Sequence, residues 1–164
     1  CRFGIMFPDD KIAAAAEALR VLRPGGRIAY MVWGPYEENP PFHVPRRAVA
    51  VFFDEEEGPV PARHSMSAPG TLKAILDGAG FVRTEERDLK YKNPVGDLET
   101  YVTNGLNRSF ADKVEGMEQT EFARLRQALM DAWAPYYEDG MTRVPNLARL
   151  GIGWKEVNSA STLK

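Results

Sequence analysis

The chain has 164 residues, enough for one compact domain with a hydrophobic core, and 44% of them are hydrophobic and 27% charged. Its 21 Lys and Arg against 23 Asp and Glu give a formal net charge of -2, which argues against a general nucleic-acid or anionic-membrane surface. No apolar run approaches the roughly 20 residues of a membrane span. The single cysteine excludes an internal disulfide and favours a reducing, cytoplasmic setting.

The first residues read as the end of a buried strand. Cys1 leads directly into the apolar run from Phe3 to Phe7, and natural domains rarely begin at such a point. This start has two interpretations, a piece of a longer protein or a truncated gene product, and the residues leave both open.

A helix follows this strand stub, with Asp9 or Asp10 as its N-cap. The turn Pro24-Gly25-Gly26 ends the helix. The next run, from Ile28 to Trp33, is apolar on both faces, as in a strand buried within a sheet. These segments predict two parallel strands joined by a crossover helix. Residues at helical spacing form one apolar stripe along that helix: Ile12, Ala15, Ala16, Leu19 and Leu22.

The pattern becomes irregular between Gly34 and Pro69, where glycines and prolines predict a long loop. Residues 44–53 have the spacing of one short helix. The acidic run from Asp54 to Glu57 favours a solvated loop over a metal site.

The second half predicts more helices and two strands. The strand at 81–91 carries many charges, which is typical of a sheet edge, and we expect it to lie antiparallel beside the last strand. The predicted elements are a helix at 68–77 capped by Ser67, the edge strand, helices around 98–106 and 122–133, a turn at Asp139-Gly140, a strand at 142–155 and a polar tail at 158–164.

Three of these segments resemble a known family. The stub, the helix and the turn at residues 20–26, with the sequence RVLRPGG, resemble the middle of a class I S-adenosylmethionine-dependent methyltransferase of the ubiquinone/menaquinone-biosynthesis type. In that family such a turn joins the fourth helix to the fifth strand. Residues 76–81 resemble its step into the sixth strand, and residues 139–155 its seventh strand.

The resemblance implies an α/β fold in which residues 1–157 are the C-terminal part of a methyltransferase domain. The sheet would be a partial Rossmann-like methyltransferase sheet made of strands four to seven with flanking helices. Its order would be stub, fifth, seventh and sixth strand, with the last strand of the chain antiparallel. The implied activity is methyl transfer from S-adenosylmethionine to a small or lipophilic acceptor. The alternative is a non-catalytic binding or dimerisation module derived from this fold.

In that family, the residues that bind the cofactor lie upstream of the matched part. They are a glycine-rich loop, an acidic residue for the ribose and a polar position for the adenine. The glycine pair at residues 151 and 153 lies inside a predicted strand, where close packing or a bulge explains it better. We therefore expect this chain alone to bind S-adenosylmethionine weakly or not at all and to be inactive alone. Its candidate cofactor contacts are Arg2, Phe3 and Gly4.

Candidate acceptor residues are mostly aromatic. His43, in the predicted loop after the fifth strand, is a candidate general base, and a surface loop histidine is the plainer alternative. Neither His43 nor His64 has cysteine or carboxylate neighbours at metal-ligand spacing, so no metal site is predicted. We expect an apolar acceptor pocket at the carboxyl end of the sheet, lined by Phe7, Trp33, Tyr36 and Phe42, with Phe3 and Met6 beside them. The alternative is that these side chains only pack in the core.

The strand stub also predicts self-association. Without the strands that would cover it, the edge at residues 2–5 would present unpaired backbone groups. The side chains of Phe3, Ile5, Met6 and Phe7 would form an apolar patch. A two-fold homodimer would pair the strand edge and bury the apolar patch. A missing N-terminal half would also cover this edge, and so would the long loop if it folded back over it.

Overall fold

Separate stretches of the chain come together in two units in the computed structural model, which describes residues 1–157. Unit 1 consists of Cys1–Tyr36, Val60–Lys90 and the described residues from Leu147 on. Unit 2 consists of Glu37–Pro59 and Tyr91–Asn146. The predicted polar tail at 158–164 lies outside the described residues.

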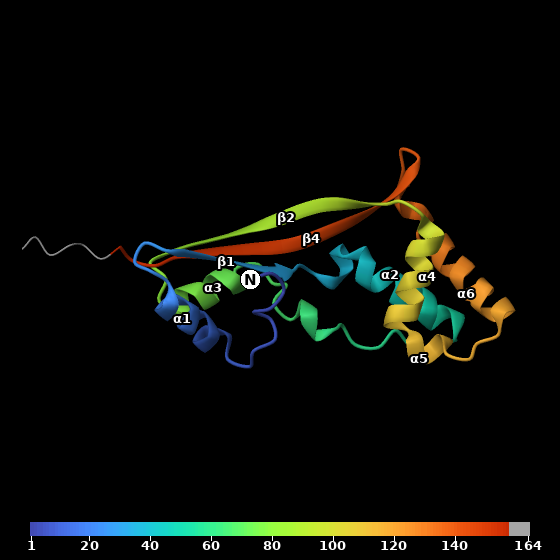
Figure 1. Cartoon of the computed structure of the whole chain (residues 1–164), viewed down its shortest axis with the longest axis horizontal. Coiled ribbons are helices and arrows are strands. Elements are labelled where there is room, and N and C mark those ends of the chain that lie inside the picture. The colour runs from blue at the N-terminus through green and yellow to red at the C-terminus, as the bar shows by residue number, and fades with distance from the viewer. Residues whose placement is uncertain (158–164) are drawn as a thin grey trace, which may run out of the picture. The chain divides into compact units, whose positions relative to one another are not determined.

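A mixed sheet forms the frame of unit 1 (Figure 1). Strand β1 (Arg27–Trp33) pairs antiparallel with β4 (Met141–Trp154), and β2 (Arg83–Val95) lies on the other side of β4. The stub meets β1 in a parallel bridge between Arg2 and Met31. The order of stub, β1, β4 and β2, with β4 antiparallel, confirms the α/β sheet order predicted above. Strand β2 is at the edge, as its charges indicated.

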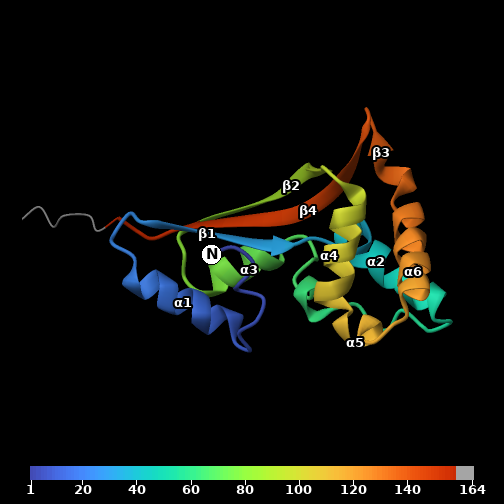
Figure 2. The same ribbon diagram turned by 45° about the vertical axis from the view of Figure 1, so that its right-hand side comes forward.

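Two helices cover one face of this sheet, α1 (Lys11–Val21) and α3 (Thr71–Gly78), as Figures 1 and 2 show. The carboxylate of Asp10 caps α1 by accepting a hydrogen bond from Ala13 N at 2.8 Å. The predicted cap of α3 is wrong. Its N-cap is Gly70, in the left-handed region at φ 82°, while the Ser67 carbonyl accepts a hydrogen bond from Arg149 instead.

The glycines of β4 let α3 approach the sheet closely. A Cβ atom on Gly151 would lie 2.8 Å from the Cβ of Leu72, and one on Gly153 would lie 2.8 Å from the ring of Phe81. Leu72 is fully buried. This confirms that the glycine pair serves packing.

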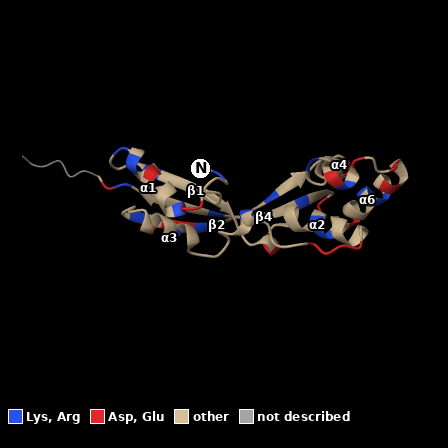
Figure 3. Ribbon diagram, turned by 90° about the horizontal axis from the view of Figure 1, so that it is seen from below, with Lys and Arg blue, Asp and Glu red and all other residues tan. Residues whose placement is uncertain are grey.

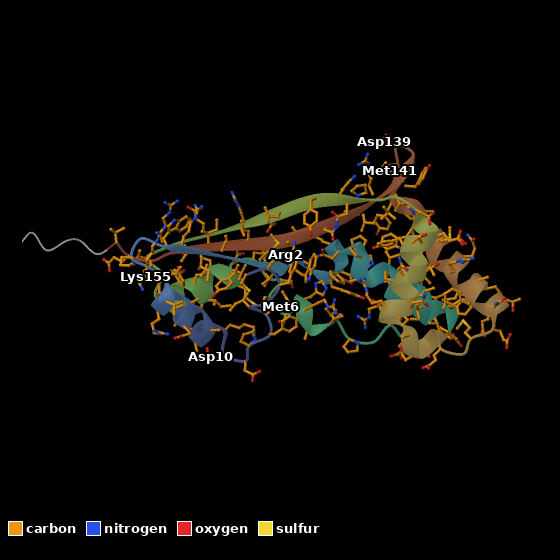
Figure 4. The ribbon with its side chains drawn as sticks, viewed as in Figure 1. Arg2, Met6, Asp10, Asp139, Met141 and Lys155 are labelled. Carbon is orange, nitrogen blue, oxygen red and sulfur yellow. The ribbon has the colours of Figure 1, made fainter. Side chains whose placement is uncertain are left out.

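The turn after α1 requires both of its glycines. Gly25 has φ 72°, and its N–H donates to the Glu156 carbonyl at 3.0 Å. A Cβ on Gly26 would lie 2.7 Å from the carbonyl oxygen of Arg23. The ammonium of Lys155, labelled in Figure 4, donates to the carbonyls of Leu19 and Leu22 at 2.8 and 2.7 Å. The positive charge of Lys155 therefore pairs with carbonyl groups at the C-terminus of α1, where the helix dipole favours a cation.

Replacing Gly26 with valine should lower the free energy of unfolding by about 2 kcal/mol, because the new side chain would meet a backbone oxygen that cannot move aside. Urea denaturation followed by circular dichroism measures this. Gly96→Val is the control, since a Cβ at Gly96 meets nothing within 4 Å. Equal losses in both variants would contradict the explanation.

The expectation that Ile5 and Met6 lack cover is wrong. They are only 4% and 5% exposed and belong to the core of unit 1. The stub is held by backbone bonds from Met31 N to Cys1 O and from Phe3 N to Met31 O. Phe7, in contrast, remains 68% exposed.

Unit 2 is mainly helical. It contains α2 (Pro40–Phe52), α4 (Leu98–Ser109), α5 (Ala111–Val114) and α6 (Gln119–Ala132), and Figure 2 shows α4 beside α6. Helix α6 packs against both α2 and α4. A short 3₁₀ turn lies at Ala134–Tyr136 in this unit, a second at Ala62–His64 belongs to unit 1, and a third at Tyr36–Glu38 lies where the chain passes from unit 1 to unit 2. The central core residues are Val44, Val102, Leu106, Leu125, Leu129 and Trp133.

Helix α2 corrects the predicted loop. It begins at Pro40, before the short helix suggested at 44–53, and keeps Pro45 in its interior. Prolines in the first turn are tolerated because the N–H groups there have no partner within the helix. His43 and Phe42 are therefore helical residues. The short α5 was also not predicted.

The turn predicted at Asp139-Gly140 is confirmed as a tight hairpin. Both residues have positive φ, 50° and 81°, as a type I′ turn requires. The turn joins β3 (Tyr137–Glu138) to the start of β4 at Met141, and Figure 4 labels Asp139 and Met141 at its tip.

Candidate functional site

The candidate cofactor residues lie in the stub beside β1. Phe3 has φ 59°, unusual for a bulky residue, and its ring stacks on Trp33 with ring centroids 3.9 Å apart and planes 7° apart. The Arg2 guanidinium lies 6.0 Å from the centroid of the Phe3 ring. A Cβ on Gly4 would lie 2.7 Å from Cys1 Sγ. The structure thus brings Phe3 together with the predicted acceptor residue Trp33.

The fit of S-adenosylmethionine to unit 1 can be tested on its helix N-termini, where backbone N–H groups usually receive anions. The methionine part of this cofactor carries a carboxylate. At α1 the Asp10 carboxylate already accepts from Ala13 N. At α3 the Glu86 carboxylate accepts from Gly70 N and Lys73 N at 2.6 and 2.9 Å. A second carboxylate would be repelled at either end, so the described residues of unit 1 do not fit the cofactor there.

The aromatic candidates after β1 are only partly gathered. Tyr36 is buried and meets the ring of His64 edge to face, with ring centroids 5.3 Å apart. A ring nitrogen of His64 lies 2.8 Å from the Gly34 carbonyl oxygen. His64 was not a predicted site residue, and here it holds the segment that follows β1. Phe7 is exposed, and Phe42 belongs to α2 in unit 2.

A mainly apolar hollow lies within unit 2, between α2 and α6. Its volume is about 590 Å³, within the range typical of small-molecule sites. His43 lies at this groove and is only 7% exposed, which corrects its placement in a surface loop. The groove is lined by His43, Val44, Arg47, Ala48, Val51, Phe52, Ala128, Ala132, Pro135 and Tyr136.

A charged cluster lies at the same groove. The Arg47 guanidinium donates to both carboxylate oxygens of Glu37 at 2.8 and 2.6 Å, and its Nε donates to Glu57 at 3.0 Å. Burial lowers the pKa of His43 from its ordinary value, and the nearby charge of Arg47 lowers it further. The two glutamates and a hydrogen bond to the Glu37 backbone oppose this. The net effect is a lowered pKa of His43, which favours the neutral imidazole.

The sequence pattern missed most of this groove. Only His43 among its lining residues was a predicted site residue. The only other sequence signal for the groove is weak. Ala128 and Ala132 occur four residues apart, which places two small side chains on one face of an amphipathic helix.

Residues 1–157 contain no group of three or more His, Cys, Asp or Glu side chains that could hold a metal ion. In the same part of the chain, every helix is too short or too polar to cross a membrane. In the ribbon of Figure 3, positions of Lys or Arg and positions of Asp or Glu both occur on the helices of each unit.

Comparisons with solved structures give distant similarities. A presumed methyltransferase of Bacillus halodurans has 15% identity and a TM-score of 0.41, covering 96% of this chain and 63% of that one. The YcgJ protein of Bacillus subtilis has 17% identity and a TM-score of 0.43, covering 95% and 62%. Phosphoethanolamine N-methyltransferase 2 of Haemonchus contortus, in complex with phosphomonomethylethanolamine and S-adenosylhomocysteine, has 13% identity and a TM-score of 0.41, covering 94% and 32%.

The chain thus spans less than two thirds of the length of each of these structures. No protein-family model and no curated protein matches it.

Proposed function

We propose that the chain is the C-terminal part of a class I S-adenosylmethionine-dependent methyltransferase of the ubiquinone/menaquinone-biosynthesis type, with a small or lipophilic acceptor. The observation that carries the proposal is the sheet order. A parallel stub lies beside β1, and the last strand, β4, is antiparallel to β1 and lies between β1 and β2. The same order follows from the family resemblance of the RVLRPGG turn. A cytoplasmic location belongs to the same proposal.

We place most of the cofactor contacts outside this chain. Asp10 and Glu86 occupy the helix N-termini of unit 1, and we expect the glycine-rich loop to come from residues preceding Cys1 or from a partner chain. Arg2, Phe3 and Gly4 would then touch only the edge of the cofactor. The proposed acceptor residues remain Phe7, Trp33, Tyr36 and Phe42, with His43 as a candidate general base.

We expect isothermal titration calorimetry to detect no micromolar binding of S-adenosylmethionine to the 164-residue chain. Each polar group of the cofactor left without a partner costs about 1–3 kcal/mol. A micromolar dissociation constant would contradict this expectation.

The family assignment itself is tested on the gene. Coding sequence upstream of Cys1 should contain a glycine-rich loop, and the longer chain should bind the cofactor. If the longer chain carries no such loop, or carries it and fails to bind, the methyltransferase assignment is wrong.

The second candidate function is a homodimerisation module. Phe7 favours it, because this large apolar side chain is 68% exposed beside the stub. Sedimentation at micromolar concentration should then show a dimer that Phe7→Ser weakens. Val21→Ser is the control, since Val21 is similarly exposed at 65% but lies at the end of α1. A monomeric wild-type chain would contradict this function.

A further inference from the structure

The groove between α2 and α6 is open because of small side chains on one wall. Ala128 and Ala132 stand one helical turn apart on α6 and face the apolar residues of α2. Among those, Val51 is 81% exposed. An apolar hollow with an uncovered valine at its wall is a place where a ligand would remove apolar surface from water.

The walls of the groove are held by the core behind them. Val44 is 7% exposed, and its neighbours in the core, Leu129 and Trp133, are each 1% exposed. Tyr136 packs edge to face on Trp133 with ring centroids 5.4 Å apart. Because these residues are fixed by packing, the groove is preformed, and binding requires little ordering.

The charged cluster decides which ligands are suitable. The guanidinium of Arg47 forms ion pairs with Glu37 and Glu57, so the cluster has two negative charges for one positive charge. An anionic ligand would compete with two carboxylates for one cation. Two further cations lie near the cluster or the groove, and neither is a lining residue. The Arg124 guanidinium lies 5.8 Å from the centroid of the Phe52 ring, and the Arg46 guanidinium donates to the carbonyls of Glu57 and Pro59 at 2.7 and 3.1 Å.

We propose that this groove binds an uncharged, apolar small molecule and that the Glu37–Arg47–Glu57 cluster excludes anionic ligands from it. All the residues involved belong to unit 2. His43 lines this groove and is also the candidate general base proposed above, but binding at the groove needs no cofactor and is tested without it.

A matched pair of fluorescent probes tests the charge selectivity. N-phenyl-1-naphthylamine is neutral, and 1-anilinonaphthalene-8-sulfonate is nearly the same molecule with a sulfonate. Titrated without S-adenosylmethionine, the neutral probe should bind one site per chain, and the anionic probe should bind about tenfold more weakly, which equals about 1.4 kcal/mol. Equal affinities would overturn the charge selectivity.

Filling the groove tests the location. Ala132→Phe should abolish binding of the neutral probe. Ala123→Phe is the control, because Ala123 is exposed on the same helix and does not line the groove. Circular dichroism verifies that both variants fold. Unchanged binding to a folded Ala132→Phe chain overturns the proposal, as does binding that falls with increasing protein concentration, since a second copy would then occupy the groove.

Removing the two carboxylates tests the cluster. The double variant E37Q/E57Q should raise the affinity for the anionic probe about tenfold and leave that for the neutral probe unchanged. The double variant E115Q/E118Q changes the net charge equally, at two exposed glutamates that do not line the groove, and should leave both affinities unchanged. An equal gain in both variants would show a general charge effect and overturn the role of the cluster.

Discussion

Replacing Gly151 with alanine is expected to lower the free energy of unfolding by about 2 kcal/mol, because the new methyl group would overpack the contact between β4 and α3. The Cβ would lie 2.8 Å from Leu72 Cβ and 3.3 Å from Leu76 Cδ1. Since Leu72 Cβ is bound directly to the helix backbone, the helix or the strand must shift. Urea denaturation followed by circular dichroism measures the loss.

The control for this variant is Gly105→Ala in α4. A Cβ at Gly105 meets nothing within 4 Å, and alanine in a helix interior is more favourable than glycine by about 0.5–1 kcal/mol. The control should therefore be slightly stabilised. If Gly151→Ala is tolerated as well as Gly105→Ala, close packing does not explain the glycine, and approach of a ligand to the backbone becomes the better explanation.

Replacing Asp88 with alanine should cost about 3 kcal/mol, since it strips a buried cation of its ion partner. Arg149 of β4 has a side chain only 8% exposed, and its guanidinium donates to the Asp88 carboxylate of β2. Its Nε also donates to the Ser67 carbonyl at 2.7 Å. With Asp88 gone, the guanidinium stays buried without its counter-charge.

The reverse substitution should be milder. Arg149→Met keeps the apolar stem of the side chain, and the Asp88 side chain it leaves behind is 43% exposed and can be hydrated. We expect a loss of about 1 kcal/mol. The measurement is the difference between the two variants in chemical denaturation. A larger loss for Arg149→Met than for Asp88→Ala would show that desolvation of the cation is not the main cost.

Several elements of the two units could be predicted because their signals are local. The Asp10 cap, the turn at Gly25 and Gly26, and the hairpin at Asp139-Gly140 each depend on a few neighbouring residues whose backbone preferences are strong. The order of the strands required the family resemblance as well, because pairing between residues far apart leaves no local signal.

The candidate groove could not be predicted in the same way. Helix α2 was hidden by Pro40, Pro41 and Pro45, which suggest a loop unless the chain context supports the helix. Its packing on α6 joins residues about 80 positions apart. The partners of Arg47 are ten residues away on either side, in segments without regular spacing.

The sequence by itself determined the local elements of this protein: the capped helix, the glycine turn, the buried and edge strands and the hairpin. It did so because caps, turns and apolar periodicity act over a few residues. Only the tertiary structure decided that Ile5 and Met6 are covered, that Phe7 is not, and that His43 and Arg47 meet α6 at an apolar groove. Burial and ion pairing depend on which distant segments come together, and that choice is made by the packing of the whole unit.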